Sequence, residues 1–322
     1  MAYKEKGYVS IVCYLRDDAA VIESFISKVA PIISESFDFY QYVFVDDFSL
    51  DNTFQVATET LEKMKLPGTV LSLSQKHGEE RGLLAGLDKA VGDFVIEFDC
   101  PTIDFSLELI NQAFGLVKSG KDIVVIHPAK PNKFMTRVYY YLFNKLSYLN
   151  EPISTERMTV MTRRALNAIL NIDERVRYKK ALLSLAGFPR QSIPYKPLNK
   201  DYIDKRSYSE KFLSAFENFV SYTALGSRAP LFLSMLFFLF SVLIGGWVMW
   251  NYFFYTNVVE GWISTVGFLS MSFSGLFFLL GILSEYVTKI LREVVNLPIY
   301  TIGKSFTSSC SNNDNLDDEN CD

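Results

Sequence analysis

Several carboxylates follow apolar segments at places where strands would end. Asp46 and Asp47 close the segment "YQYVFVDD", Asp99 closes "DFVIEFD", and Asp104 follows shortly after. Carboxylate oxygens bind Mg²⁺ or Mn²⁺, and a bound metal neutralises the charge of a leaving diphosphate. Asp residues in such positions also form turns and cap helices. The carboxylates therefore predict either a site for a metal and a phosphorylated ligand or a set of tightly fixed loops.

The segments that carry these carboxylates alternate between strand and helix patterns. The expected strands cover residues 8–15, 40–47, 69–74, 93–99 and 121–128. The expected helices cover residues 20–33, 52–65, 80–91 and 106–120. Asp51 or Asn52 could cap the second of these helices. Such alternation predicts an α/β fold with a doubly wound, mainly parallel sheet, whose ligands bind outside the carboxyl ends of the strands.

The composition of the 322-residue chain limits the classes of protein to which it can belong. A net charge of −4 argues against a general nucleic-acid-binding protein, which needs a basic surface. The four cysteines lack the spacing of a metal site and are expected to be reduced thiols. The polar N-terminal residues predict no cleavable signal peptide. The length allows one sizeable domain and an additional segment.

Two uncharged apolar runs occupy the C-terminal part of the chain. They cover residues 229–259 and 261–284, and each exceeds the roughly 20 residues that a membrane helix needs. The runs predict a hairpin of two transmembrane helices at about residues 231–253 and 262–284. Two buried core helices would also be apolar, and they are the alternative.

The positive charges around the hairpin predict its orientation. Arg228 precedes the first run, and Lys289 and Arg292 follow the second, whereas the link between the runs has no Lys or Arg. Positive charges next to membrane helices stay in the cytoplasm. The sequence therefore predicts an integral inner-membrane protein with two spans and with both termini in the cytoplasm.

Three motifs in this order resemble those of membrane-bound family 2 glycosyltransferases. They are "VFVDDFSLDNT", "LSQKHGEERGLLAGLDKAVGDFVIEFD" and "GILSEYVTKILREVVNLPIYTI". The resemblance extends from about Tyr8 to Ile302 and is to the polyprenyl-phosphate glycosyltransferases, which act on bactoprenol or dolichol phosphate. It implies a GT-A (Rossmann-like) domain at residues 1–200. It also implies transfer of a sugar from a nucleotide-sugar donor to a polyprenyl phosphate at the cytoplasmic membrane face.

The resemblance implies which residues hold the donor. Asp46 and Asp47 would contact the nucleotide, with Asp17 and Lys76 beside them. Phe48 stands where the family has a glycine in this loop.

The metal site that the resemblance implies is altered. Asp99 would be the metal ligand and, together with Asp104, a catalytic carboxylate. Pro101 replaces the second carboxylate of the family's Asp-x-Asp pattern, and Arg157 falls on a further aspartate of the family. Proline offers only its carbonyl oxygen, so Mg²⁺ or Mn²⁺ is expected to bind weakly.

Basic residues are assigned to the acceptor side of the predicted site. A guanidinium or an ammonium group can bind the phosphate of the lipid. The implied lipid-phosphate ligands are Lys130, Arg163, Lys205 and Arg206. Residues 201–228 are expected to form an acceptor loop and an amphipathic helix at the membrane interface. Residues 285–305 would be a cytoplasmic juxtamembrane segment and residues 306–322 a disordered acidic tail.

Two functions are open at this point. The first is a glycosyltransferase for cell-surface glycans whose partners are a nucleotide sugar, a polyprenyl phosphate and membrane lipid, with assembly into a homo-oligomer left open. The second is a catalytically impaired, membrane-anchored relative that binds a lipid phosphate, a nucleotide or a partner protein. Both hypotheses place the ligand at the carboxyl ends of the strands.

Overall fold

The computed structural model describes two compact units of the chain. The described residues are 5–129, 134–147, 155–172, 179–185, 187–198, 261–294 and 298–308, together with 215, 236, 237, 239, 240, 243 and 250. The first unit holds a large sheet and the helices that cover it. The second unit holds a long helix from the C-terminal part of the chain.

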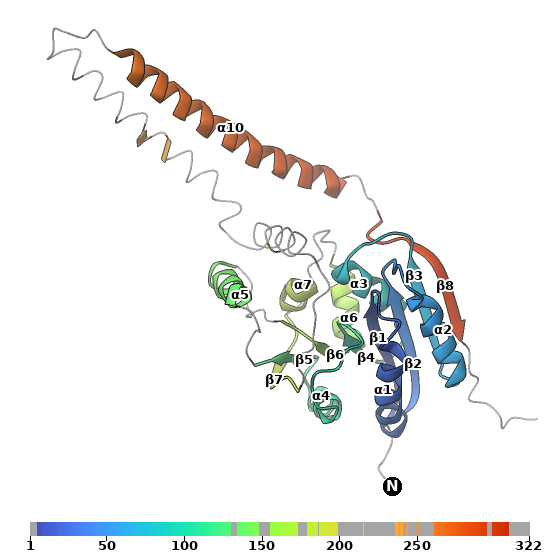
Figure 1. Ribbon diagram of the computed structural model, residues 1–322. Coiled ribbons are helices and arrows are strands. Elements are labelled where there is room, and N and C mark those ends of the chain that lie inside the picture. The colour runs from blue at the N-terminus through green and yellow to red at the C-terminus, as the bar shows by residue number, and fades with distance from the viewer. Residues whose placement is uncertain are drawn as a thin grey trace, which may run out of the picture. The chain divides into compact units, whose positions relative to one another are not determined.

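Eight strands form one sheet in the order β7-β5-β6-β4-β1-β2-β3-β8 (Figure 1). They are β1 (Glu5–Leu15), β2 (Phe37–Asp46), β3 (Gly68–Leu73), β4 (Phe94–Phe98), β5 (Ile123–Pro128), β6 (Met158–Thr162), β7 (Arg190–Tyr195) and β8 (Ile302–Ser308). Strands β1 to β4 pair in parallel, as do β5 and β7. Strand β6 is antiparallel to β4 and β5, and β8 is antiparallel to β3. The predicted mainly parallel α/β sheet is therefore confirmed, and β6, β7 and β8 are additions to it.

Helices cover both faces of this sheet. They are α1 (Ile22–Ser36), α2 (Thr53–Lys63), α3 (Glu79–Lys89), α4 (Glu108–Lys118), α6 (Arg163–Leu170) and α7 (Lys179–Leu185), and α5 (Phe134–Leu146) is a further helix of the described residues. Helix α1 shows why they form, because its buried residues recur every three or four positions from Ile22 to Ile33. The four predicted helices correspond to α1, α2, α3 and α4.

The apolar side chains divide into one core on each face of the sheet. One core contains buried residues of α1, α2 and α4, and the other contains buried residues of α3, α6 and α7. Strand β1 contributes to both, since Ile11 and Cys13 face the first core and Val12 faces the second. A Cβ atom added to Gly86 of α3 would lie 2.6 Å from Val12 Cγ1, so glycine permits the close approach of this helix. This packing fixes the start of α3 beside the carboxyl ends of the strands.

The chain returns to the sheet after the long helix of the second unit. Strand β8 pairs with β3 along the outer edge, from Gly68 with Ser308 to Leu73 with Ile302. The predicted juxtamembrane segment and disordered tail therefore need correction at their junction, because residues 302–308 belong to the sheet. The hydrogen-bonded register of residues 302–308 with β3 explains why this polar segment forms a strand. Residues 309–322 of the predicted tail lie outside the described residues.

Helix α10 (Gly261–Val294) contains the second predicted span and continues past its expected end. Its exposed large apolar side chains include Leu276, Phe277, Phe278 and Leu283. Most of the first predicted span lies outside the described residues. Within the part of the chain that the structure describes, no helix has the length and apolarity required to cross a membrane.

Candidate active site

Four parallel strands end at the same edge of the sheet. We call it the carboxyl edge. The edge consists of the loops that follow β1, β2, β3 and β4. The predicted donor and metal residues Asp17, Asp46, Asp47, Lys76 and Asp99 all lie on these loops or at the strand ends that precede them. The structure therefore brings these residues to one edge of the sheet, and their roles toward a ligand stay predictions.

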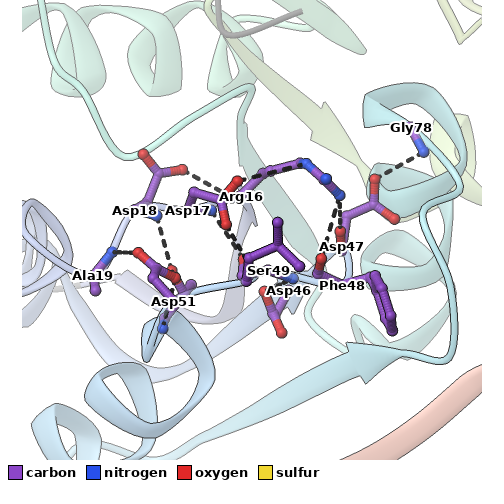
Figure 2. Close-up of polar contacts among 12 residues, drawn as sticks. Arg16, Asp17, Asp18, Ala19, Asp46, Asp47, Phe48, Ser49, Asp51 and Gly78 are labelled. Atoms are coloured by element: carbon purple, nitrogen blue, oxygen red, sulfur yellow. Dashed lines mark hydrogen bonds and ion pairs between the residues drawn. The ribbon is translucent and has the colours of Figure 1, made fainter.

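Asp17 joins the loop after β1 to the loop after β2. Its Oδ1 accepts a hydrogen bond from the backbone N–H of Leu50 at 2.7 Å. Its own N–H donates to Ser49 Oγ at 2.9 Å (Figure 2). The residue has a φ of 51°, a left-handed conformation that Asp adopts more readily than most residues. The carboxylate stays exposed at the carboxyl edge, so it fixes the loops and is still accessible to a ligand.

The start of α2 is fixed by Asp51. Its Oδ1 accepts a hydrogen bond from the N–H of Thr53 at 3.0 Å, and its Oδ2 accepts one from the N–H of Ala19 at 3.2 Å. Asn52, the other predicted cap, makes no side-chain capping hydrogen bond. Asp51 thus caps the helix and holds the loop after β1 against it.

Asp47 connects the loop after β2 to the loop after β3. Its carboxylate accepts hydrogen bonds from the N–H groups of His77 at 2.7 Å and Gly78 at 2.8 Å, and from Tyr14 Oη at 2.8 Å. Gly78, seen beside Asp47 in Figure 2, has a φ of 89°, which a side chain would strain. Burial raises the pKa of Tyr14, and the neighbouring Asp47 raises it further. The fully buried Asp47 is therefore the central fixing point of the two loops.

Asp46 is held in a similar way by neutral donors. The N–H of Ser49 donates to its Oδ1 at 3.2 Å, and Ser72 Oγ donates to its Oδ2 at 3.1 Å. Burial raises the pKa of Asp46, and the two serines oppose that rise. Asp46 and Asp47 thus perform the loop-fixing role that was one of the two alternatives, and their predicted contact with a nucleotide stays a prediction.

Phe48 adopts the backbone conformation that a glycine would adopt without strain. Its φ is 56°, in the left-handed region, and its side chain is half-exposed and directed away from the loop contacts (Figure 2). This conformation explains why the family pattern has a glycine at the same position. Lys76 on the loop after β3 is exposed, so a cation stands at the carboxyl edge.

Arg157 lies between the two carboxylates that follow β4. Its Nη1 donates to Asp99 Oδ2 at 2.7 Å, and its Nε lies 3.4 Å from Asp104 Oδ1. Its Nη2 donates to the carbonyl oxygen of Thr102 at 3.0 Å. Only 2% of the Arg157 side chain is exposed, against 11% for Asp99. The guanidinium is therefore enclosed by acceptors from the loop after β4.

The direction of β6 brings Arg157 to this place. Because β6 is antiparallel to β4, Met158 pairs with Phe98, and Arg157 comes next to Asp99. The N–H of Asp99 donates to the carbonyl oxygen of Arg157 at 3.2 Å. Tyr195 of β7 closes the far side by donating its hydroxyl to Asp104 Oδ1 at 2.6 Å.

Comparison with known proteins places this sheet and its carboxyl edge in a family. Residues 8–170 match glycosyl transferase family 2, which is about half of the chain. The chain belongs to glycosyltransferase family 2. The SfII prophage-derived bactoprenol glucosyl transferase of Shigella flexneri is 28% identical over 276 residues, covering 82% of this glycosyltransferase and 87% of the relative. The uncharacterized glycosyltransferase YkcC of Bacillus subtilis is 23% identical over 310 residues, covering 92% and 94% of the two chains.

A solved structure is also similar to part of this glycosyltransferase. The mannosyltransferase PcManGT from Pyrobaculum calidifontis, in complex with GDP-Man and Mn²⁺, is 17% identical. The match covers 67% of the present chain and 63% of the other, with a TM-score of 0.49.

The surroundings of Asp99 do not fit a divalent metal in this glycosyltransferase. Asp99 and Asp104 already share one guanidinium, and Thr102 offers its carbonyl to the same group. Burial raises the pKa of the Cys100 thiol, so this neighbour stays protonated at neutral pH. Among the described residues, no group of three or more His, Cys, Asp or Glu side chains is placed to hold a metal ion. The expected weak Mg²⁺ or Mn²⁺ site therefore stays a prediction, and Arg157 lies between the two carboxylates that would form it.

Arg163 lies at the opposite edge of the sheet from Asp99, which corrects its predicted role as a lipid-phosphate ligand. It follows β6, whose last residue Thr162 pairs with Phe94 at the start of β4. Its Nε donates to the carbonyl oxygen of Gly92 at 2.8 Å, and its Nη2 donates to that of Ala90 at 2.8 Å. Arg163 lies at this edge because β6 runs antiparallel to β4. The other predicted lipid-phosphate ligands, Lys130, Lys205 and Arg206, lie outside the described residues.

A buried ionic network beneath the carboxyl edge was not predicted. Lys179 of α7 pairs with Glu97 of β4, and its Nζ lies 3.7 Å from Glu156 Oε2. Arg190 of β7 pairs with Glu156 Oε1 at 2.7 Å. One signal existed in the sequence, since Glu97 is a charged residue inside the apolar strand "FVIEF". The network joins β4, β7 and α7, and it fixes the strand that ends at Asp99.

Proposed function

We propose that this glycosyltransferase transfers a sugar from a nucleotide-sugar donor to a polyprenyl phosphate. One observation carries the proposal, which is the alignment with a bactoprenol glucosyl transferase over 82% of the chain and 87% of that relative. The alignment is longer than the family 2 domain at residues 8–170, so it includes part of the chain beyond that domain. A shared catalytic domain alone would suggest only a sugar donor, whereas similarity over this length favours a similar acceptor.

The donor would lie at the carboxyl edge. The loops after β1, β2 and β3 are tied together through Asp17 and Asp47, so they form a preorganised surface. Exposed Lys76 supplies a positive charge for a diphosphate at this surface. Asp17 remains exposed there and could accept hydrogen bonds from the hydroxyl groups of a ribose.

The acceptor would reach the site from a membrane. The uncharged runs at residues 229–259 and 261–284 support a two-span anchor in the inner membrane, with the sheet domain in the cytoplasm. Lys205 and Arg206 precede the first run in the sequence and would bind the lipid phosphate. A cysteine introduced at Asn257 should react with an impermeant reagent outside intact cells, and Cys310 should not. The reverse labelling would contradict this orientation.

A second candidate is a relative that binds a nucleotide or lipid phosphate without transferring a sugar. The observation that favours it is the ion pairing of Asp99 and Asp104 with Arg157, since both carboxylates were expected to take part in catalysis. A carboxylate held by a buried guanidinium is poorly placed to receive a proton from an acceptor.

The deciding experiment uses the purified full-length protein with undecaprenyl phosphate and a panel of nucleotide sugars. Mass spectrometry of the lipid fraction should detect a glycosylated undecaprenyl phosphate with one donor. Changing both Lys205 and Arg206 to Ala should reduce product formation and lipid binding together, because two cations near the phosphate are lost. Arg163→Ala is the matched control and should leave lipid binding unchanged, since its guanidinium is bonded to Ala90 and Gly92. Binding of nucleotide or lipid without product from any donor would favour the second candidate.

A further inference from the structure

The loop after β4 encloses a cation that comes from another part of the chain, the residue just before β6. Arg157 is enclosed by Asp99, Asp104 and Thr102, with donor–acceptor distances from 2.7 to 3.4 Å. Two independent strands hold it there, because β6 carries Arg157 next to Asp99 and β7 carries Tyr195 next to Asp104. The arrangement therefore belongs to the sheet and does not depend on a flexible surface side chain.

We propose that Arg157 is a built-in substitute for a divalent metal, so that the carboxyl edge binds the diphosphate of its donor without a metal ion. The inference rests on the proposed function, because it concerns how the same edge accepts a nucleotide sugar. It also goes beyond that function, because it assigns Arg157 the role of permanent counter-ion to Asp99 and Asp104.

Charge and geometry both favour the guanidinium over a metal. A metal ion at Asp99 would lie close to a buried positive charge, and the low dielectric of the interior strengthens their repulsion. A metal would also have to replace the hydrogen bonds that Arg157 makes to two carboxylates and one carbonyl. Pro101 offers no side-chain oxygen in return, and the Cys100 thiol is a soft ligand that Mg²⁺ and Mn²⁺ disfavour.

The positive charge that a diphosphate needs can come from other side chains of the same edge. Lys76 is exposed on the loop after β3, and Arg16 is partly exposed on the loop after β1. Arg16 Nη1 donates to backbone carbonyl oxygens of Asp47 and Phe48, so the loop after β2 holds its guanidinium in place (Figure 2). These two cations belong to the chain itself and need no metal to reach the ligand.

The test is direct binding of Mn²⁺ to the full-length protein, followed through the paramagnetic resonance signal of free Mn²⁺. The wild type and Pro101→Asp should leave the signal unchanged, because both keep the Arg157 guanidinium. The double variant Pro101→Asp, Arg157→Asp should remove about one equivalent of Mn²⁺ and should melt at a higher temperature in its presence. Pro101→Asp is the matched control, since it adds the carboxylate and leaves the buried cation in place.

Several results would overturn the inference. One is binding of Mn²⁺ by the wild type or by Pro101→Asp within about tenfold of the affinity of the double variant. Another is a folded double variant that binds no Mn²⁺, because Arg157 would then not be what excludes the metal. If the double variant does not fold, Arg157→Gln keeps most of the side-chain volume without the charge, and Mn²⁺ must raise its melting temperature.

A second measurement separates this inference from the proposed function. The wild type should bind UDP or GDP with the same affinity, within about twofold, in EDTA and in Mn²⁺. A loss of nucleotide affinity of more than about tenfold in EDTA would overturn the proposal that the diphosphate binds without a metal. Absence of binding to either nucleotide under both conditions would count against the proposed function, and the Mn²⁺ titration would still decide the role of Arg157.

Discussion

The two halves of the carboxyl edge satisfy their carboxylates with different partners. Asp46 and Asp47, after β2, accept hydrogen bonds from neutral N–H and hydroxyl groups. Asp99 and Asp104, after β4, share the charged guanidinium of Arg157. Neutral donors fix a carboxylate and leave its negative charge in place, whereas the single guanidinium also offsets one of the two negative charges that Asp99 and Asp104 carry when ionised. The first half is therefore a pair of buried carboxylates that fix the loops, and in the second half both carboxylates already contact a cation of the protein.

Removing the guanidinium should have the largest effect on the free energy of unfolding. Arg157→Met keeps a long side chain and leaves two buried carboxylates without their counter-ion, so it should lower that free energy by about 3–5 kcal/mol. Denaturant titration of the full-length protein measures the change. The control is Lys63→Met, whose partner Glu23 lies 2.7 Å away in an exposed pair. This control should change the free energy of unfolding much less, because solvent screens an exposed ion pair, and equal costs for the two variants would contradict the comparison.

The neutral half should respond less strongly to a similar change. Asp47→Asn replaces one carboxylate oxygen by an NH₂ group. This donor would then face an N–H or hydroxyl group that donates to the carboxylate in the wild type. The free energy of unfolding should fall by about 1–3 kcal/mol. Tyr14→Phe removes one hydrogen bond from the same carboxylate and should cost only about 1 kcal/mol. The double variant tests the link, because strictly additive costs would mean that Tyr14 and Asp47 act independently.

The smallest effect is expected at Phe48. Phe48→Gly should raise the free energy of unfolding by up to about 1 kcal/mol, because relief of the left-handed strain exceeds the entropy that glycine adds to the unfolded chain. Phe39→Gly is the control, since Phe39 is also exposed but lies inside β2. That control should lower the free energy by about 0.5–1 kcal/mol. A loss of stability at both positions would show that the Phe48 side chain makes a favourable contact that outweighs its strain.

The sequence predicted the elements of the sheet domain because their signals are local. An apolar run such as "FVIEF" is buried on both faces of a sheet, and α1 repeats its apolar residues at helical spacing. The same local signals placed Asp47 and Asp99 at strand ends. They could not reveal which donors each carboxylate would meet, since those donors come from other loops.

The direction of β6 was the main fact that the sequence could not supply. The strand "MTVMT" is short, and its composition does not depend on whether it runs parallel or antiparallel to β4. Its antiparallel direction brings Arg157 to Asp99 and takes Arg163 to the opposite edge. Two arginines that are close together in the sequence thus lie at opposite edges of the sheet. Their spacing in the sequence does not predict this difference.

Strand β8 has a consequence for the order in which the protein is made. Its partner β3 ends at Leu73, whereas β8 begins only at Ile302. At a synthesis rate of about 5–20 residues per second, the outer edge of β3 waits on the order of 10–50 seconds for its partner. An unpaired strand edge is a template for association with other chains during that interval. Strand β8 therefore also protects the nascent domain, and a chain that stops before Ile302 should leave the ribosome with the edge of β3 unpaired.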